Sequence, residues 1–424
     1  LVDNAGLLTA DGGQIFLSAK SAGGLLDTVV NQSGVVQANS LSGANGEIRL
    51  DGGSRGVVQV SGNLLAQGAQ AGTQGGTVKV LGDKVGLFGA ATVDVSGQNG
   101  GGKVLLGGDF HGQGADTNAS QTIIASGASI HADALQSGAG GQVAVWSDQH
   151  TTFAGKITAR GGAAGGDGGL VETSGKQVLQ ALGTVDARAG SGTHTDANGV
   201  RTKGKNGIWL LDPNNISIDA VGVNTNISQT VGSFSTTDDN AIVSNTSLGA
   251  ALSGGTTVKV QTGSNGSNAQ TGSITVNSTV TASGNATLNL DAQGDIIFTA
   301  AGKIDAGGNV LNVNLNAGSD NSFTEPGTNT SAITMAAGSS IVTNGGSIVA
   351  TGKGSGITLA GIDTGAGSLT VKANDGPISQ NSGLTVGGNA AFDAGTAAID
   401  LSTSVNTIAN LGAVTGTGGA FKFD

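Results

Sequence analysis

The sequence has no cysteine and no tyrosine, and it contains only 3 prolines and 1 methionine. Without cysteine there is no disulfide framework of the kind that stabilises small secreted domains. A large solenoid does not need disulfides, and a chain that is threaded unfolded through a narrow pore passes more easily without them. The scarcity of proline, together with the lack of a strict glycine at every third position, excludes collagen.

Charge is scarce as well. Charged residues make up 11% of the chain, against roughly 25% in an ordinary domain. The formal net charge is −11, so there is no basic stripe of the kind that nucleic-acid binding requires, and an anionic membrane surface is disfavoured. No apolar run approaches the roughly 18 residues of a membrane-spanning helix. We therefore expect neither a nucleic-acid partner nor membrane insertion.

Glycine is abundant, at 78 of 424 residues. This is more than twice the usual share of about 7%. Because glycine costs roughly 1 kcal/mol per helical position relative to alanine, long helices are excluded. Disorder is also disfavoured, because disordered chains are poor in β-branched residues, whereas short runs of Val, Ile and Leu recur throughout this chain.

These runs alternate apolar and polar residues and are bounded by Gly, Asn, Asp or Ser, which is the signature of β-strands. Examples lie at residues 46–53, 75–83, 101–109, 140–148, 286–298 and 345–354. The strands are short, and pairs of them recur at a spacing of roughly 20–25 residues without a linker, as in a solenoid. The sequence therefore predicts an all-β fold, a right-handed parallel β-helix (β-solenoid) in the form of an elongated rod. Gly and Asn would turn the corners with positive φ, and small aliphatic side chains would stack inside.

The rhythm is interrupted once. Residues 190–207 are polar and indicate a loop, 208–220 form the distinctive segment IWLLDPNNISIDA, and 221–250 do not alternate. Residues 247–255 indicate one short helix or turn that covers the core. We accordingly expect β-helix coils over 1–205, a junction over 206–255 and further, degenerate coils over 256–424. The first residues lack the basic start and apolar core of a signal peptide, which indicates an interior segment of a longer chain.

Several segments resemble the filamentous haemagglutinin family of two-partner secretion exoproteins, which includes high-molecular-weight adhesins. They are GGTVKVLGDKVGLFG (75–89), VDVSGQNGGGKVLLGGDFHG (93–112), ASIHADAL (128–135), GGQVAVWSDQHTTFAGKITARGG (140–162), GGDGGLVETSGK (165–176) and IWLLDPNNISID (208–219). Their order and spacing carry the resemblance, and residues 1–70 and 256–424 are similar to coils on either side.

The resemblance implies a right-handed parallel β-helix that is secreted or displayed on a bacterial cell surface, in association with the outer membrane. It implies export by an outer-membrane two-partner secretion transporter, which would recognise a region absent from this chain. It also implies a role in attachment or aggregation, with surface glycans or exopolysaccharide as partners. A stalk that delivers a toxin to contacting cells is one alternative function.

A polysaccharide-cleaving enzyme is the other alternative, because several β-helices cleave acidic polysaccharides with clustered carboxylates. Glycoside hydrolysis needs two carboxylates roughly 5 to 9.5 Å apart. The candidate acids are Asp83, Asp94, Asp109, Asp133, Asp148 and Glu172. Most of the aspartates lie beside glycine at strand ends, where aspartate favours turns. The turn interpretation is preferred, so no catalytic residue is assigned and no enzymatic activity is expected.

Metal and cofactor sites are also not expected. The four histidines, His111, His131, His150 and His194, are scattered, whereas a zinc site needs three or four convergent ligands. The segment GGAAGGDGGL (161–170) is faintly similar to the calcium-binding Gly-Asp repeat, which is compatible with one adventitious calcium ion.

The two tryptophans are notable because aromatic residues are rare. Trp209 lies within the apolar run IWLL, which favours a core position. Trp146 is interpreted as a core residue too, although Trp146 and Asp148 are the candidates for stacking on and bonding to a sugar. Pro213 suits an exit turn. Glycosylation sequons are numerous and mostly coincidental, at Asn31, Asn118, Asn215, Asn226, Asn245, Asn277 and Asn285.

Overall fold

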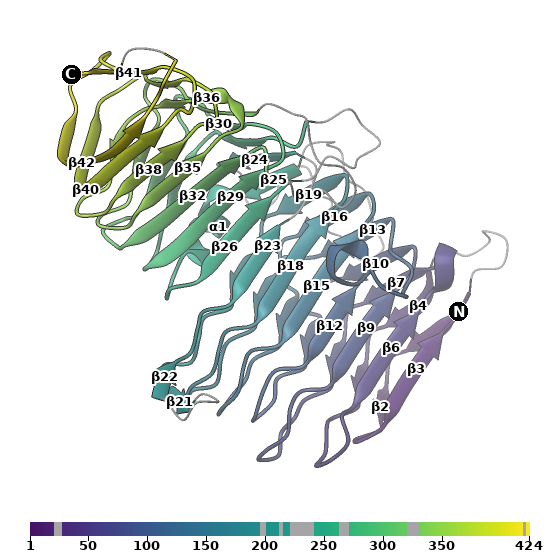
Figure 1. Ribbon diagram of the computed structural model, residues 1–424. Helices are drawn as coiled ribbons and strands as arrows, with labels where there is room; N and C mark the ends of the chain where they lie inside the picture. The colour runs from purple at the N-terminus through teal and green to yellow at the C-terminus, as the bar shows by residue number, and fades with distance from the viewer. Residues whose placement is uncertain are drawn as a thin grey trace. The chain divides into compact units, whose positions relative to one another are not determined.

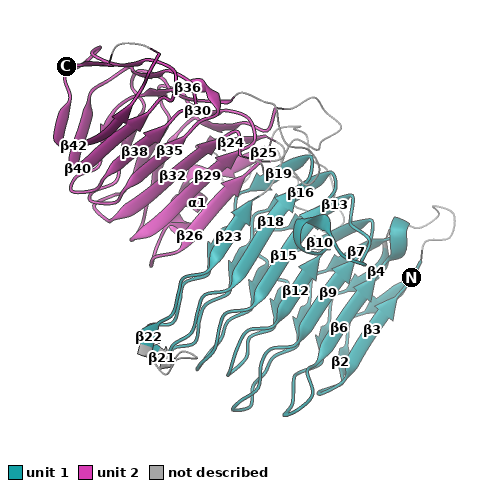
Figure 2. Ribbon diagram, in the orientation of Figure 1, with its two compact units in different colours: residues 1–212, 222–239 teal, residues 213–221, 240–424 magenta. Residues whose placement is uncertain are grey.

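The structure is a computed structural model that describes residues 1–20, 28–195, 201–211, 215–220, 241–262, 271–319, 331–418 and 421–424. The chain divides into two compact units, and Figure 2 colours them separately. The first comprises residues 1–212 and 222–239, and the second comprises residues 213–221 and 240–424. The expected exit turn at Pro213 and the sequon at Asn226 lie outside the described residues.

In the first unit, each turn of the chain adds one short strand to each of three parallel sheets, so the coils stack as a parallel β-helix (Figure 1). The first sheet contains β1 (Val2–Asn4), β4 (Thr28–Gln32), β7 (Val57–Val60), β10 (Lys84–Leu87), β13 (Gln121–Ile124), β16 (His150–Phe153) and β19 (Val178–Ala181). The second contains β2 (Leu7–Thr9), β5 (Val35–Gln37), β8 (Asn63–Leu65), β11 (Thr92–Asp94), β14 (Ser129–His131), β17 (Lys156–Thr158) and β20 (Thr184–Asp186). The third contains β3 (Gln14–Ser18), β6 (Glu47–Asp51), β9 (Thr77–Leu81), β12 (Lys103–Leu106), β15 (Gln142–Ser147), β18 (Leu170–Gly175) and β23 (Ile208–Leu211).

The second unit repeats this plan. One sheet contains β25 (Ala241–Ser244), β24 (Ile216–Asp219), β27 (Ile274–Val276), β30 (Ile296–Phe298), β33 (Ser331–Met335), β36 (Gly354–Leu359), β39 (Ile378–Gln380), β41 (Ile399–Leu401) and β43 (Phe421–Phe423). A second row of short strands contains β28 (Thr279–Thr281), β31 (Lys303–Asp305), β34 (Ser340–Val342) and β37 (Ile362–Asp363). The third row contains β26 (Thr257–Gln261), β29 (Ala286–Ala292), β32 (Leu311–Ala317), β35 (Ile348–Thr351), β38 (Leu369–Lys372), β40 (Leu384–Asp393) and β42 (Thr407–Thr415). The predicted all-β parallel β-helix is thus confirmed.

The last coils of the second unit are shorter than the coils of the first unit. In the second unit Ile357, Ile378 and Ile399 are successive partners, and their spacing agrees with the expected one. In the first unit the expected spacing is wrong, because the successive partners Val30, Val58 and Val85 lie farther apart in the sequence. The added length lies in the connections to the third sheet: residues 66–76 join β8 to β9, whereas only 306–310 join β31 to β32.

Register places similar side chains at several corresponding positions of successive coils. In the second unit seven buried isoleucines lie in one column, at positions 216, 274, 296, 333, 357, 378 and 399, with Ala241 at one end and Phe421 at the other. In the first unit Trp209 continues a column of buried valines that includes Val143 and Val171. Trp209 is fully buried, and its indole N–H donates to Thr173 Oγ1 at 2.9 Å. The core position predicted for Trp209 is therefore confirmed.

Glycine has a second role besides turning corners. Positive φ is found at corners such as Gly43, Asn344 and Asn374, as expected. The glycines that precede the third-sheet strands do not have positive φ, and they form a column of their own that begins at Gly46. A Cβ on any later member would lie 2.1–2.2 Å from the carbonyl oxygen of the glycine one coil before; these members are at positions 76, 102, 141, 169 and 207. Glycine is required there because the backbones of successive coils approach too closely for any side chain.

Two further segments deviate from the regular coil. Helix α1 (Asn245–Ala251) follows β25, buries Leu248 and Ala251, and is the short helix expected near residues 247–255. In the expected loop at 190–207, β21 (Thr193–Thr195) and β22 (Arg201–Lys203) pair antiparallel. Among the described residues, no helix has the length and apolar character needed to cross a membrane.

The glycine column generates a stability prediction. Gly141→Ala should lower the free energy of unfolding by about 1–3 kcal/mol, the usual cost of overpacking, because its Cβ would lie 2.2 Å from Gly102 O. Gly6→Ala is the control, since the nearest atom to its Cβ would be Asn4 Oδ1 at 3.9 Å. Urea denaturation measures both variants, and equal stability of the two would contradict the close-approach explanation.

Candidate functional site

An insertion in the first unit brings together three of the six candidate acids and one of the two tryptophans. Residues 107–120 join β12 to β13 and lengthen that coil, so that the partner of Val85 in the next coil is Thr122. We call residues 107–120 the strap. Its side chains and backbone contact residues on the outward face of the third sheet, from Arg49 on β6 to Glu172 on β18. Leu105 on β12 and Ala144 on β15 occupy outward positions on the same face, yet both are fully buried.

Trp146 packs against the strap. Only 6% of its surface is exposed, and a Cβ on Gly112 would lie 2.4 Å from the Trp146 ring. The indole N–H of Trp146 donates to Asp148 Oδ1 at 3.1 Å. Asn118 from the strap donates to the same oxygen at 3.1 Å and to Gly112 O at 2.9 Å. Trp146 is thus a packing residue, as its core interpretation predicted, and Asp148 holds the strap in place.

Two more candidate acids bind backbone N–H groups of the strap: Glu172 from β18, and Asp109 from the strap itself. The carboxylate of Glu172 is fully buried and accepts the backbone N–H of His111 at 3.0 and 3.2 Å. Asp109 accepts the backbone N–H of Phe110 at 2.8 Å and lies 3.3 Å from Lys103 Nζ. These carboxylates are therefore engaged by groups of the strap and its neighbours, which explains why acids gather here.

Asp116 anchors the far end of the strap. It forms ion pairs with Arg49 at 2.8 Å and Lys79 at 2.9 Å, from two successive coils. Arg49 also pairs with Asp51 at 2.8 Å. Partial burial alone would raise the pKa of Asp116, but the hydrogen bonds from Lys79 and Arg49 outweigh it and hold that pKa below its ordinary value.

Asp133 belongs to a separate corner of the first unit. It is 4% exposed and accepts hydrogen bonds from the Arg160 guanidinium at 2.8 and 3.3 Å and from Thr158 Oγ1 at 2.9 Å. Burial alone would raise the pKa of Asp133, but the bonds from Arg160 and Thr158 lower it below the ordinary range. His131 lies next to this group, with Nδ1 3.0 Å from Thr158 Oγ1. These hydrogen bonds link neighbouring coils where the chain turns, so we interpret Asp133 as a structural residue.

The remaining candidates are dispersed. Asp83 lies in the bend between β9 and β10, and Asp94 ends β11 and accepts the N–H of Ser96 at 2.8 Å, as turn residues do. Asp167 of the glycine-rich segment accepts the N–H of Lys205 at 2.7 Å. His150 begins β16, and the side chain of His194 lies outside the described part. Within the described ranges, no three His, Asp or Glu side chains converge as metal ligands.

The outward face of the third row in the second unit has a different character. It presents rows that consist mostly of polar side chains, such as Thr257–Thr287–Asn312 and Lys259–Asn289–Asn314, the second of which continues to the exposed Val349. Asn314 Nδ2 donates to Asn289 Oδ1 at 2.7 Å, forming one step of an asparagine ladder. Lys259 pairs with Asp291 at 3.1 Å. We call this surface the polar face, and it is defined by these residues together with Asn316, Thr351, Thr370 and Lys372.

Comparison with known families gives one match. A family model described as repeats of unknown function (DUF5649) matches residues 345–417. The match spans β35 to β42, where successive partners such as Ile357, Ile378 and Ile399 recur at short spacing. A comparison with curated proteins gives no match.

The strap generates a prediction that depends on pH. Asp116→Asn should reduce the free energy of unfolding by about 1 kcal/mol at pH 7, because partly exposed ion pairs contribute little each, and should speed hydrogen exchange in residues 107–120. Because the folded pKa of Asp116 is lowered from 3.8, its contribution is complete above the unfolded pKa and is lost as pH falls through the folded pKa. The difference from wild type should therefore vanish in strong acid.

Exchange measured by mass spectrometry at pH 7 and denaturation measured across pH test this prediction. Thr117→Ala is the control, since Thr117 is an exposed neighbour on the strap. Exchange in the strap that is equally slow in Asp116→Asn and wild type would show that the ion pairs do not hold it.

Proposed function

We propose that this chain is a segment of the stalk of a secreted or cell-surface adhesin, and that it mediates attachment or aggregation by polar binding to glycans. The observation that carries the proposal is the polar face, on which threonine and asparagine side chains recur in successive coils beside the charged residues Lys259, Asp291 and Lys372. Such a surface offers many equivalent shallow contacts to a hydroxyl-rich polymer. Weak contacts repeated along a stiff support reach high avidity without a deep pocket.

The same geometry gives no support to the enzymatic alternative. A hydrolase needs two carboxylates open to substrate. Asp109, Asp148 and Glu172 are instead bonded to groups of the strap and its neighbours, and Glu172 has no exposed surface. Asp133 is bonded to Arg160 and Thr158. We therefore propose a binding protein rather than a polysaccharide-cleaving enzyme, with no cofactor.

The proposed location and export route rest on the resemblance to filamentous haemagglutinin. In that scheme an outer-membrane two-partner secretion transporter exports the longer protein and leaves this segment outside the cell. The absence of cysteine supports the scheme, because no disulfide has to form before or after passage. The stacked coils support it as well, because each coil contacts its neighbours and folding can propagate along the stack.

The proposal predicts binding without turnover. The full chain, incubated with immobilised plant, bacterial and host glycans, should bind a subset of them and promote attachment of beads that carry it. Reducing-end and unsaturated-uronate assays of the same glycans should give no product. Product release would contradict the proposal in favour of an enzyme, and the absence of binding to any glycan would reduce the segment to a spacer.

A further inference from the structure

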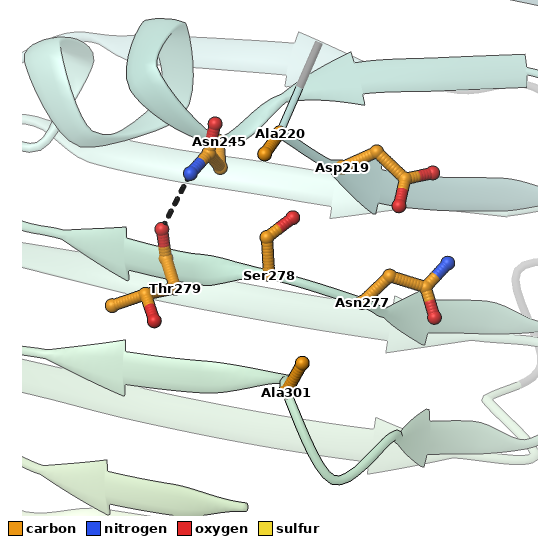
Figure 3. A pocket seen from close by; sticks show the side chains of 7 residues that line it. All are labelled: Asp219, Ala220, Asn245, Asn277, Ser278, Thr279 and Ala301. Carbon is orange, nitrogen blue, oxygen red and sulfur yellow. Dashed lines mark hydrogen bonds between the residues drawn. The ribbon is translucent and has the colours of Figure 1, made fainter.

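The second unit contains a surface depression that the polar face does not include. It has a volume of about 680 Å³ and lies where β24, α1 and two turns meet. Figure 3 shows its construction: Ala220, Ser278 and Ala301 follow one another down the stack, with Asp219 and Asn277 on one side and Asn245 and Thr279 on the other. Three small side chains in successive coils thus form the floor of a groove with polar walls.

The groove exists because the regular coil is interrupted here. Ser278 and Ala301 belong to the turns that lead from β27 to β28 and from β30 to β31. In the coil that begins with β25, helix α1 follows directly in place of a second-row strand. Asn245 at the start of α1 donates from Nδ2 to Thr279 O at 2.7 Å, which fixes this wall to the next coil.

The opposite wall is held by a chain of hydrogen bonds. Asn277 Nδ2 donates to Ser217 Oγ at 2.9 Å, and Ser217 Oγ donates in turn to Asp219. This arrangement orients the Asp219 carboxylate and the Asn277 amide side by side. Among the described residues, no cationic side chain pairs with Asp219, so its charge is not neutralised there. Asn277 keeps Oδ1 as an acceptor, and Ser278 adds a hydroxyl between the walls.

These groups select a class of ligand. A carboxylate beside an amide accepts and donates hydrogen bonds in the pattern that vicinal hydroxyl groups offer, and Ser278 and Thr279 add groups that do both. The described residues that line the groove include no cation, and the chain has a net charge of −11, so an anionic ligand is repelled. A bound calcium ion is disfavoured, because it takes about 6–8 oxygen ligands and these lining residues supply only one carboxylate.

We propose that this groove binds a neutral, hydroxyl-rich oligosaccharide lying along the stack of coils over Ala220, Ser278 and Ala301. The volume is within the range of small-ligand sites, roughly 300–1,000 Å³. None of the described lining residues is aromatic, so affinity comes from hydrogen bonds alone and is weak at each site. This inference rests on the proposed glycan-binding function and specifies where, and to which class of glycan, the chain binds.

Saturation-transfer NMR titration of the full chain tests the proposal, with maltohexaose, mannohexaose and chitotetraose as neutral probes and oligogalacturonate as the acidic probe. At least one neutral probe should bind, and oligogalacturonate should bind at least about tenfold more weakly. Asp219→Ala should weaken the neutral probe at least about tenfold, the typical effect of losing a charge-assisted hydrogen bond. Ala301→Gln should block the groove without burying the new side chain, since Ala301 is exposed.

Ala337→Gln is the matched control, because Ala337 is an exposed alanine in a turn of the next coil and does not line the groove. It should bind the probe as wild type does, and circular dichroism should show all variants folded.

Unchanged binding in Asp219→Ala and Ala301→Gln would overturn the groove while leaving the proposed function intact. Equal binding of oligogalacturonate would overturn the ligand class. Wild-type protein that binds no probe here but does bind immobilised glycans would also overturn the groove, whereas failure of both assays would overturn the proposed function itself.

Discussion

The structure depends on one constraint, the in-register stacking of successive coils. Each strand forms backbone hydrogen bonds with the corresponding strands of the neighbouring coils. A side chain therefore lies next to the side chains at the corresponding positions of those coils. The isoleucine column of the second unit is the plainest result, with seven buried isoleucines in line. The glycine column of the first unit is the steric counterpart, since a single methyl group there would collide with the coil below.

Register also decides which surfaces can bind. Because strands alternate inward and outward residues, every outward position becomes a row along the stack. In the first unit the strap crosses the outward face of the third sheet. The bonds that hold it there involve the carboxylates of Asp109, Asp116, Asp148 and Glu172. In the second unit the corresponding rows form the polar face, and the groove beside Asp219 lies where α1 interrupts the coil. The same architecture therefore provides a face that the strap crosses in the first unit and the polar face in the second unit.

The sequence was sufficient for the fold because alternation, turn residues and repetition are local signals. It also located the short helix near 247–255 and the buried Trp209. It did not reveal why the glycines before the third sheet are needed. Glycine is required there by the close approach of the preceding coil and not by a positive φ. Nor did it find Asp116, whose partners Arg49 and Lys79 come near only by stacking. Asp219 and Asn277 were missed for the same reason, because β24 and β27 are neighbours in the sheet but not in the sequence. The lengthened spacing between the strands at 84–87 and 121–124 was the one available signal of an insertion.

The register itself is open to a direct measurement, because the chain has no cysteine of its own. Coils stack at roughly 4.8 Å, and a disulfide requires Cα atoms roughly 4.4–6.8 Å apart. The double variant Asn289→Cys/Asn314→Cys places cysteines at partner positions, whereas Asn289→Cys/Asn316→Cys displaces one of them to the next outward position on the same face. Under mild oxidation, followed by mass spectrometry, the first pair should form an intramolecular disulfide and the second should not. Equal formation in both, or formation only in the displaced pair, would contradict the stacked register on which the account depends.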